Sequence, residues 1–322
     1  MNHNDLILHD TSRDGIDRRG FLRCMGWAGT AVVCSFAGGI LTSRALGDVL
    51  ANPGVVAGAE LNFVQISDTH IGFNKPANTN VIGTFQEAIN RINALAKAPE
   101  FMLHTGDLSH LAQADEFDTV EQMLKTTKAA KVFYVPGEHD MIDEGQGKAY
   151  LERYGKGSKG AGWYSFDDHG VHFIGLVNVV DLKAGGMGNL GAEQLAWLAD
   201  DLSGRSASTP IVVFAHIPLW TIAPEWGWGT EDSAQALALL ARFGSVTVLN
   251  GHIHQLMQKV EGNVTFHTAR STAFPQPAPG TAPAPGPMLV PAGELRKLLG
   301  VRNVVYQPGV QPLAVTDTAL AS

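Results

Sequence analysis

Residues 61–70 read Leu-Asn-Phe-Val-Gln-Ile-Ser-Asp-Thr-His, a largely apolar run that ends in an acid and a histidine. A short apolar run of this kind predicts a buried β-strand over 61–67. Outward from it, the chain repeats the arrangement, with a helix over 84–98, a strand over 101–105, a helix over 116–130 and a strand over 131–135. Strands that alternate with helices predict an α/β fold with a layered sheet.

The pattern changes after Gly162, where apolar runs flank a turn at 167–170. This spacing predicts an antiparallel hairpin over 163–178. The expected elements that follow are a helix over 191–202, a strand over 210–215, a helix over 231–243, a strand over 245–250 and a hairpin over 257–268.

Residues 275–291 hold seven of the sixteen prolines. Proline lacks the backbone donor that helices and central strands need, so we expect a polyproline II loop here. Its role stays open between a semi-rigid surface loop and a wall of the functional site or of a partner surface.

The first 47 residues resemble an export signal. Arg18 and Arg19 precede Phe21 and Leu22, and the 18 uncharged residues 24–41 follow. A charged segment before an apolar one is typical of a signal peptide, and paired arginines resemble a twin-arginine (Tat) signal. We therefore expect cleavage near residue 47 and export by the twin-arginine machinery to the periplasm or the extracellular space. An uncleaved membrane anchor is the alternative, and a membrane is expected as a partner only in that case.

The expected mature chain is a single domain, 48–322, with the proline-rich loop 275–291 and a C-terminal extension. The full chain has 322 residues, 45% of them hydrophobic, and a net charge of −8. This composition excludes general disorder, and the acidic balance argues against nucleic-acid binding. Both cysteines, Cys24 and Cys34, lie in the signal segment. A cysteine nucleophile, a cysteine-ligated zinc and a disulfide framework are therefore excluded from the mature protein.

Five motifs that contain acids or histidines follow predicted strands. They are Asp68-Thr69-His70, Gly106-Asp107, Gly137-Glu138-His139-Asp140, His216 and Gly251-His252-Ile253-His254. Because the carboxyl ends of the strands in an open α/β sheet meet at one edge, these side chains are expected to converge. Carboxylates combined with imidazoles suit Zn, Mn and Fe. The motifs hold more ligands than one ion can use, whereas two ions about 3.5–4 Å apart would use them.

The five motifs in this order resemble those of the calcineurin-like metallophosphoesterase superfamily, over about residues 61–268. Size and spacing resemble its bacterial cyclic-nucleotide phosphodiesterase branch. The resemblance implies a four-layer α/β/β/α sandwich and two metal sites that share the Asp107 carboxylate. One site would take Asp68, His70 and His254, and the other Glu138, His216 and His252.

The resemblance also implies an activity: hydrolysis of phosphate mono- or diesters, of nucleotides or other small esters, by a metal-bridging hydroxide. The two ions would be Fe, Mn or Zn in some combination. His139 would act as proton donor or transition-state stabiliser, and Asp140 would orient it through a hydrogen bond.

Four other side chains are candidate substrate contacts. His110 follows Asp107 by three residues, and aromatic rings that can stack on a substrate follow His216 in the loop that carries Trp220, Trp226 and Trp228. The alternative for these rings is to pack the loop onto the domain.

Glu138 departs from the superfamily pattern, which has asparagine at this position. A carboxylate adds a negative charge and only accepts hydrogen bonds, whereas an amide is neutral and also donates them. We expect Glu138 either to favour a more highly charged metal pair or to weaken binding of strongly anionic phosphate. It also keeps open a second function, a metal-binding interaction protein of the same fold with weak or lost activity.

Overall fold

The structure is a computed structural model that describes residues 60–321, except 146 and 292, together with 32–37 and 40–45. The two short segments form an antiparallel hairpin of β1 (Val32–Ala37) and β2 (Ile40–Ala45). The paired arginines and the expected cleavage region lie outside the described residues. The chain divides into two units, Met1–Ala57 and Gly58–Ser322, and the second is described here by itself.

No helix in the described part of the chain has both the length and the apolar character needed to cross a membrane.

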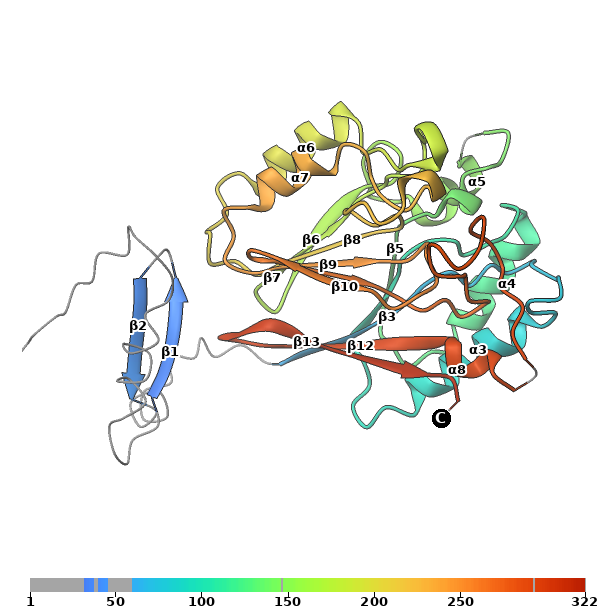
Figure 1. Cartoon of the computed structure of the whole chain (residues 1–322), viewed down its shortest axis with the longest axis horizontal. Coiled ribbons are helices and arrows are strands. Elements are labelled where there is room, and N and C mark those ends of the chain that lie inside the picture. Colours follow the sequence, from blue (N-terminus) through green and yellow to red (C-terminus); the bar gives the residue numbers. More distant parts are fainter. Residues whose placement is uncertain (1–31, 38–39, 46–59, 146, 292, 322) are drawn as a thin grey trace, which may run out of the picture. The chain divides into compact units, whose positions relative to one another are not determined.

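Two sheets form the centre of the second unit (Figure 1). The five-stranded sheet has the order β13-β12-β3-β4-β5, and the six-stranded sheet the order β10-β11-β9-β8-β7-β6. The strands of the first are β3 (Leu61–Ile66), β4 (Phe101–His104), β5 (Val132–Tyr134), β12 (Gly300–Gln307) and β13 (Val310–Ala319). Those of the second are β6 (Tyr164–Asp168), β7 (Val171–Gly175), β8 (Ile211–Ala215), β9 (Val246–Asn250), β10 (Gln258–Glu261) and β11 (Val264–Thr268).

Side-chain alternation along the strands builds three apolar layers. In β3, Leu61 and Phe63 pack between the two sheets, whereas Val64 and Ile66 face the opposite side. In β8, Phe214 packs between the sheets and Val213 faces outward. Because successive residues of a strand point to opposite faces, a strand that is buried on both faces supplies side chains to two layers at once.

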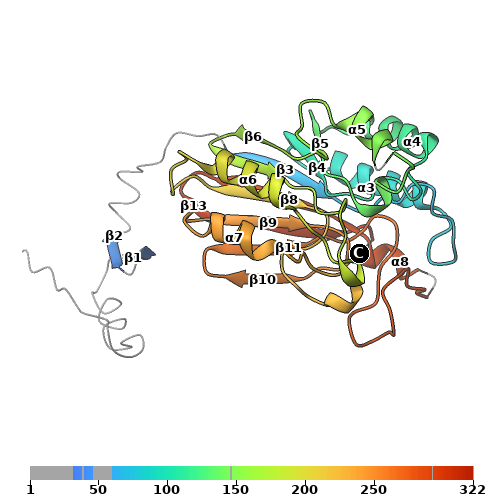
Figure 2. The ribbon, with the colours of Figure 1, turned by 90° about the horizontal axis from the view of Figure 1, so that it is seen from above.

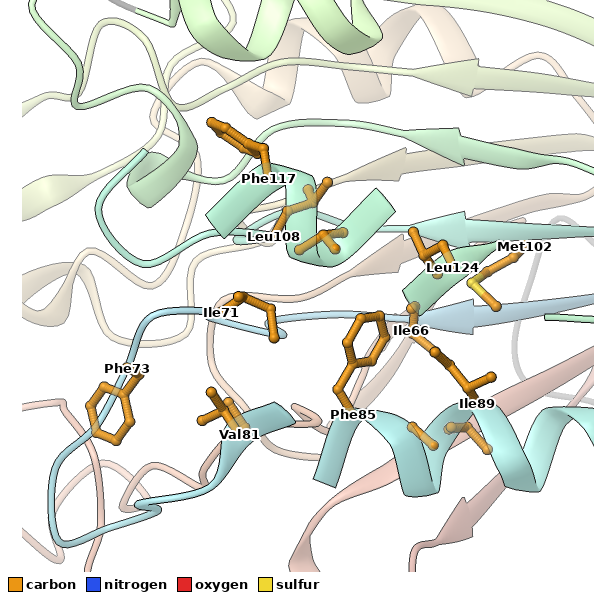
Figure 3. Packing of buried hydrophobic residues seen from close by; sticks show 14 of the residues in the cluster. Ile66, Ile71, Phe73, Val81, Phe85, Ile89, Met102, Leu108, Phe117 and Leu124 are labelled. Carbon is orange, nitrogen blue, oxygen red and sulfur yellow. The ribbon is translucent and has the colours of Figure 1, made fainter. Parts of the chain in front are cut away.

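Helices cover the two outer faces. The five-stranded sheet packs against α3 (Val81–Asn93), α4 (Ala114–Leu124) and α5 (Lys148–Tyr154), which Figure 2 shows gathered together. Figure 3 shows this layer, in which Phe85 and Ile89 of α3 and Phe117 of α4 pack with Ile66 and Met102. The other sheet packs against α6 (Ala192–Leu202) and α7 (Ser233–Leu240). The predicted four-layer α/β/β/α sandwich is confirmed.

The sequence-based predictions did not include α5, the short α8 (Leu295–Leu298) or the strands β12 and β13 of the C-terminal hairpin. The C-terminal hairpin completes the first sheet, because β12 pairs antiparallel with both β3 and β13. The parallel strands β3, β4 and β5 direct their carboxyl ends to one edge, and β7, β8, β9 and β11 are parallel to one another in the second sheet.

Candidate metal centre

The candidate ligands follow β3, β4, β5, β8 and β9. Glu138 begins a short 3-10 helix at Glu138–Asp140, and the others lie in loops. Five of them have a left-handed backbone: φ is 55° at Asp68, 41° at His70, 52° at Asp107, 68° at His252 and 53° at His254. This region is unfavourable for residues other than glycine, and such strain gathers at functional sites. These left-handed residues bend the chain sharply after β3, β4 and β9, where the ligand side chains project.

Asp68, His70 and His254 form the first of two clusters. His254 Nε2 lies 3.2 Å from Asp68 Oδ1 and 3.3 Å from His70 Nε2. All three side chains are buried. Their donor atoms therefore point to a common position that a cation can occupy.

Glu138, His216 and His252 form the second cluster. Glu138 Oε2 lies 2.9 Å from His216 Nε2, and Glu138 Oε1 lies 3.0 Å from His252 Nδ1. These distances are short, yet Glu138 Oε2, His216 Nε2 and His252 Nδ1 are buried and have no hydrogen-bond partner among the residues that the structure describes. Buried polar atoms without partners are costly. A bound metal ion would satisfy all of them, so the donor set fits an ion.

Asp107 lies between the two clusters. Its Oδ2 is 3.4 Å from His70 Nε2 and 3.4 Å from His216 Nε2. A carboxylate in this position can bind ions on both sides, which is the role that the family resemblance implies for Asp107.

In two candidate ligands, His216 and His254, the ring nitrogen that faces away from the cluster is hydrogen-bonded to the backbone. His216 Nδ1 donates to the Thr105 carbonyl at 2.7 Å, and His254 Nδ1 donates to the Phe274 carbonyl at 2.5 Å. A proton fixed on Nδ1 leaves Nε2 with a free lone pair, which is the arrangement typical of metal-binding histidines.

Each of the two clusters contains a carboxylate whose negative charge a cation would balance. Burial raises the pKa of Asp68, but His254 and His216 outweigh it and lower the pKa to about 2. Burial also raises the pKa of Glu138, but the imidazoles of His252 and His216 hold it well below its ordinary value. Both carboxyl groups are therefore ionised and available as ligands.

Two motif glycines make room for these side chains. A Cβ on Gly106, whose φ is 97°, would lie 2.4 Å from His216 Nδ1. A Cβ on Gly137 would lie 2.1 Å from Asp107 Oδ1. Both distances are far below van der Waals contact, so glycine at these positions allows the ligands to approach one another.

His139 and His110 lie together beside the first cluster. Their rings stack with centroids 4.7 Å apart, and His139 Nδ1 donates to the His110 carbonyl at 2.7 Å. Burial lowers the pKa of His139, but the Asp107 and Glu138 carboxylates and this carbonyl raise it above its ordinary value. A protonated imidazole that lines the pocket is suited to donate a proton.

Asp140 does not orient His139 in the way the sequence suggested. Its carboxylate accepts from the backbone N–H of Leu108 at 3.1 Å, of Ser109 at 2.9 Å and of Gly137 at 3.0 Å, whereas the His139 ring is held by His110. The predicted side-chain hydrogen bond is therefore wrong. Asp140 instead ties the loop after β4 to the loop after β5, which keeps Asp107 and Glu138 in register.

A pocket opens over the clusters, and its lining includes His110, Trp226 and Trp228. Trp220 does not belong to that lining within the described residues, because its ring packs against Phe266 of β11 with centroids 5.2 Å apart. The structure thus brings three of the four candidate substrate contacts to the pocket.

The pocket also contains residues that sequence reasoning missed, among them Lys75, Leu182 and Gln276. Only Lys75 carried a usable signal, a cation five residues after the Asp68-Thr69-His70 motif. The proline-rich segment reaches the pocket through Pro285, Gly286 and Pro287, which agrees with the alternative that it forms a wall of the site.

The family profile described as calcineurin-like phosphoesterase matches residues 61–256. The chain belongs to this family. As a member of this family, the chain is a metal-dependent phosphoester hydrolase.

Two curated relatives match similar shares of the chain. A 3′,5′-cyclic-nucleotide phosphodiesterase of Nostoc sp. is 25% identical over 225 residues, which are 66% of this chain and 79% of the relative. A glycerophosphodiester phosphodiesterase of Enterobacter lignolyticus is 25% identical over 226 residues, which are 66% of this chain and 78% of the relative.

Solved structures support the fold. A dimetal phosphatase from Danio rerio has a TM-score of 0.57 and 14% identity, covering 79% of this chain and 98% of its own. A purple acid phosphatase from yellow lupin seeds has a TM-score of 0.59 and 12% identity, covering 88% of this chain and 54% of its own.

Proposed function

We propose that this chain is an exported phosphoesterase that uses two metal ions to hydrolyse small phosphate esters, with diesters as its main substrates. The observation that carries the proposal is the pair of ligand clusters joined by Asp107. Asp68, His70 and His254 would hold one ion, Glu138, His216 and His252 the other, and Asp107 both. The mixed carboxylate and imidazole donors suit Fe, Mn or Zn in some combination. The names of the two relatives support diesters as substrates.

Besides the metal ligands, His139 and Asp140 have roles in the proposed reaction. Metal ions in these positions would neutralise charge on the phosphoryl oxygens and activate water. His139, held at Nδ1 by the His110 carbonyl, can donate a proton from Nε2 to the departing oxygen. Asp140 braces the two loops that carry Asp107, Glu138 and His139.

Export is part of the proposal and rests on the sequence. Its support is the Arg18-Arg19 pair followed by the uncharged residues 24–41, which suit the twin-arginine route and a mature domain that starts near residue 48. An exported enzyme meets esters outside the cytoplasm, which favours scavenging of nucleotides or other phosphate esters over an intracellular messenger.

The proposal is tested with protein freed of metal and then loaded with Mn²⁺, Zn²⁺ or Fe²⁺. We expect hydrolysis of bis-p-nitrophenyl phosphate to increase with added metal and to level off near two bound ions per chain, as measured by elemental analysis. Protein that holds two ions without hydrolysing mono- or diesters would instead support the alternative, an interaction protein that keeps metals for its structure.

Glu138→Asn should shift specificity from diesters toward monoesters. With Asp68, Asp107 and Glu138 ionised, two divalent ions leave a net charge of about +1 in the ligand shell, and the substitution raises it to about +2. A monoester dianion gains more from the added charge than a diester monoanion, so we expect its kcat/KM relative to the diester to rise about tenfold. The measurement compares p-nitrophenyl phosphate with bis-p-nitrophenyl phosphate.

Glu138→Gln is the matched control, because it removes the charge but keeps the side-chain length. An equal shift in both variants assigns the effect to charge, and bound metal is measured in each. Unchanged specificity and unchanged metal content in Glu138→Asn would contradict the assigned role of the carboxylate.

A further inference from the structure

The pocket over the candidate metal centre has a polar floor and apolar walls. Its volume is about 420 Å³. Five of the seven candidate ligands line it together with His139, namely His70, Asp107, Glu138, His252 and His254, and we call these residues its floor. Leu182, Trp226, Pro285 and Pro287 also line it, and we call these its walls. Apart from histidines, the described lining contains one cationic side chain, that of Lys75. This composition suits a ligand with a small anionic group and an apolar remainder.

Gln276 holds the proline-rich wall against the metal centre. Its Nε2 donates to the His252 carbonyl at 2.8 Å, and its Oε1 accepts from Gly286 N at 2.9 Å. Met288 N closes the loop by donating to the Pro275 carbonyl at 2.8 Å. The prolines on both sides of Gly286 have restricted φ and no N–H. The wall is therefore preformed and offers few hydrogen-bond donors to a ligand.

The second wall comes from two loops that pack on each other. Gly188 N donates to the Gly229 carbonyl at 2.9 Å, and a Cβ on Gly227 would lie 2.8 Å from the Gly186 carbonyl oxygen. Trp226 packs edge-on against Trp228 with ring centroids 5.1 Å apart. Leu182 remains 40% exposed although it lines the pocket. Its free apolar surface is available to a substrate.

We propose that these two walls bind an apolar ester arm, such as an aryl group, of a phosphodiester whose phosphate lies on the polar floor. The inference rests on the proposed function, because it names the substrate class of the same site. A polar arm such as glycerol would lose water against these walls without gaining hydrogen bonds, which is unfavourable. An apolar arm gains from the same burial. The site thus selects substrates by the arm that stays on phosphorus.

The experiment compares two diesters with the same leaving group, phenyl p-nitrophenyl phosphate and methyl p-nitrophenyl phosphate. In both, the oxygen of one water molecule forms the new bond to phosphorus and the bond to the nitrophenyl oxygen breaks. The electron pair stays on p-nitrophenolate, the water protons pass to the buffer, and phenyl or methyl phosphate remains. The ratio of kcat/KM for phenyl over methyl is measured on metal-loaded full-length protein.

Leu182→Ser should lower this ratio about five- to tenfold, because it replaces apolar wall surface that contacts only the larger arm. Leu182→Met, which keeps an apolar side chain, should retain the wild-type ratio. The matched control is Leu289→Ser in the proline-rich segment, where the side chain is 69% exposed and does not line the pocket. It should also retain the ratio. Differences in intrinsic reactivity between the two diesters cancel, because each variant is compared with the wild type.

The outcomes separate this inference from the proposed function. Failure of metal-loaded wild type to hydrolyse either diester would overturn the proposed function itself. Hydrolysis of both with the same ratio in wild type and Leu182→Ser would overturn the apolar-arm inference and leave the phosphodiesterase standing. An equal fall of the ratio in Leu289→Ser would also overturn the inference, since the effect would then not come from the pocket wall.

Discussion

Asp107→Asn is expected to lower kcat for diester hydrolysis by roughly a thousandfold, because both ligand clusters depend on this one carboxylate. Asp107 Oδ2 is 3.4 Å from a nitrogen of each cluster. Asparagine has nearly the same shape but carries no charge and presents a single oxygen. Bound metal should fall below two ions per chain, which elemental analysis after gel filtration measures alongside the rate.

The fold should survive this substitution. Asp107 Oδ1 accepts from His139 N at 2.9 Å, and the oxygen of an asparagine can accept the same hydrogen bond. Asp115→Asn is the control, an exposed aspartate at the start of α4 that should leave rate and metal content unchanged. Asp107→Asn with two bound ions and a rate within tenfold of wild type would contradict the bridging role.

The sequence predicted the strands more closely than the helices. The strand expected over 101–105 is β4 at Phe101–His104, because a short apolar run has clear polar boundaries. The helix expected over 84–98 is α3 at Val81–Asn93. It begins earlier because the Asn80 side chain accepts from Gly83 N at 2.9 Å, and a capping residue of this kind defines a start that apolar spacing does not reveal.

The C-terminal hairpin shows that a local sequence pattern can indicate strands without indicating which other strand they pair with. A Pro308-Gly309 turn between two runs rich in valine was a readable signal for β12 and β13. The pairing of β12 with β3, however, joins residues about 240 positions apart, such as Arg302 and Gln65. Such a contact depends on tertiary packing, so no local spacing could specify it.

The candidate ligands converge for a reason that the sequence does contain. They follow strands, and the carboxyl ends of neighbouring parallel strands meet at one edge. No comparable rule predicts which residues line the rest of the pocket. Lys75, Leu182 and Gln276 come from three loops, and the course of such loops depends on contacts that their side chains make elsewhere in the fold. Trp220 and Trp226 belong to one loop, yet only Trp226 lines the pocket.

Arg302 connects the two sheets through buried hydrogen bonds. It lies on β12 and is only 2% exposed. Its guanidinium donates to both oxygens of Asp317 on β13 at 2.9 and 3.0 Å, and to Gln65 Oε1 on β3 at 3.0 Å. Nη2 also donates at 2.9 Å to the carbonyl of Thr268, which lies on β11 of the other sheet. A single side chain on β12 thus satisfies acceptors on three other strands, β13, β3 and β11.

Arg302→Met should therefore lower the free energy of unfolding by about 3 kcal/mol. Methionine fills much of the volume but leaves the Asp317 carboxylate, Gln65 Oε1 and the Thr268 carbonyl without their donor. The loss stays near the lower end of the range for buried ion pairs, because Asp317 is 25% exposed and water can reach it. Urea unfolding followed by tryptophan fluorescence measures the change.

Arg296→Met is the matched control, because Arg296 makes a similar two-pronged contact with Glu87 at the surface. That pair is 45% and 36% exposed, so its loss should cost less than about 1 kcal/mol. Equal losses in the two variants would show that the Arg302 network adds nothing beyond an ordinary surface pair. A much larger loss in Arg302→Met would instead show that the inter-sheet contact stabilises the sheet edge that holds the candidate ligands. Gln65, which accepts from Arg302, provides the link to that edge. It donates to Thr105 Oγ1 at 3.0 Å and to the Asn250 carbonyl at 3.2 Å, and these two residues directly precede Gly106-Asp107 and Gly251-His252.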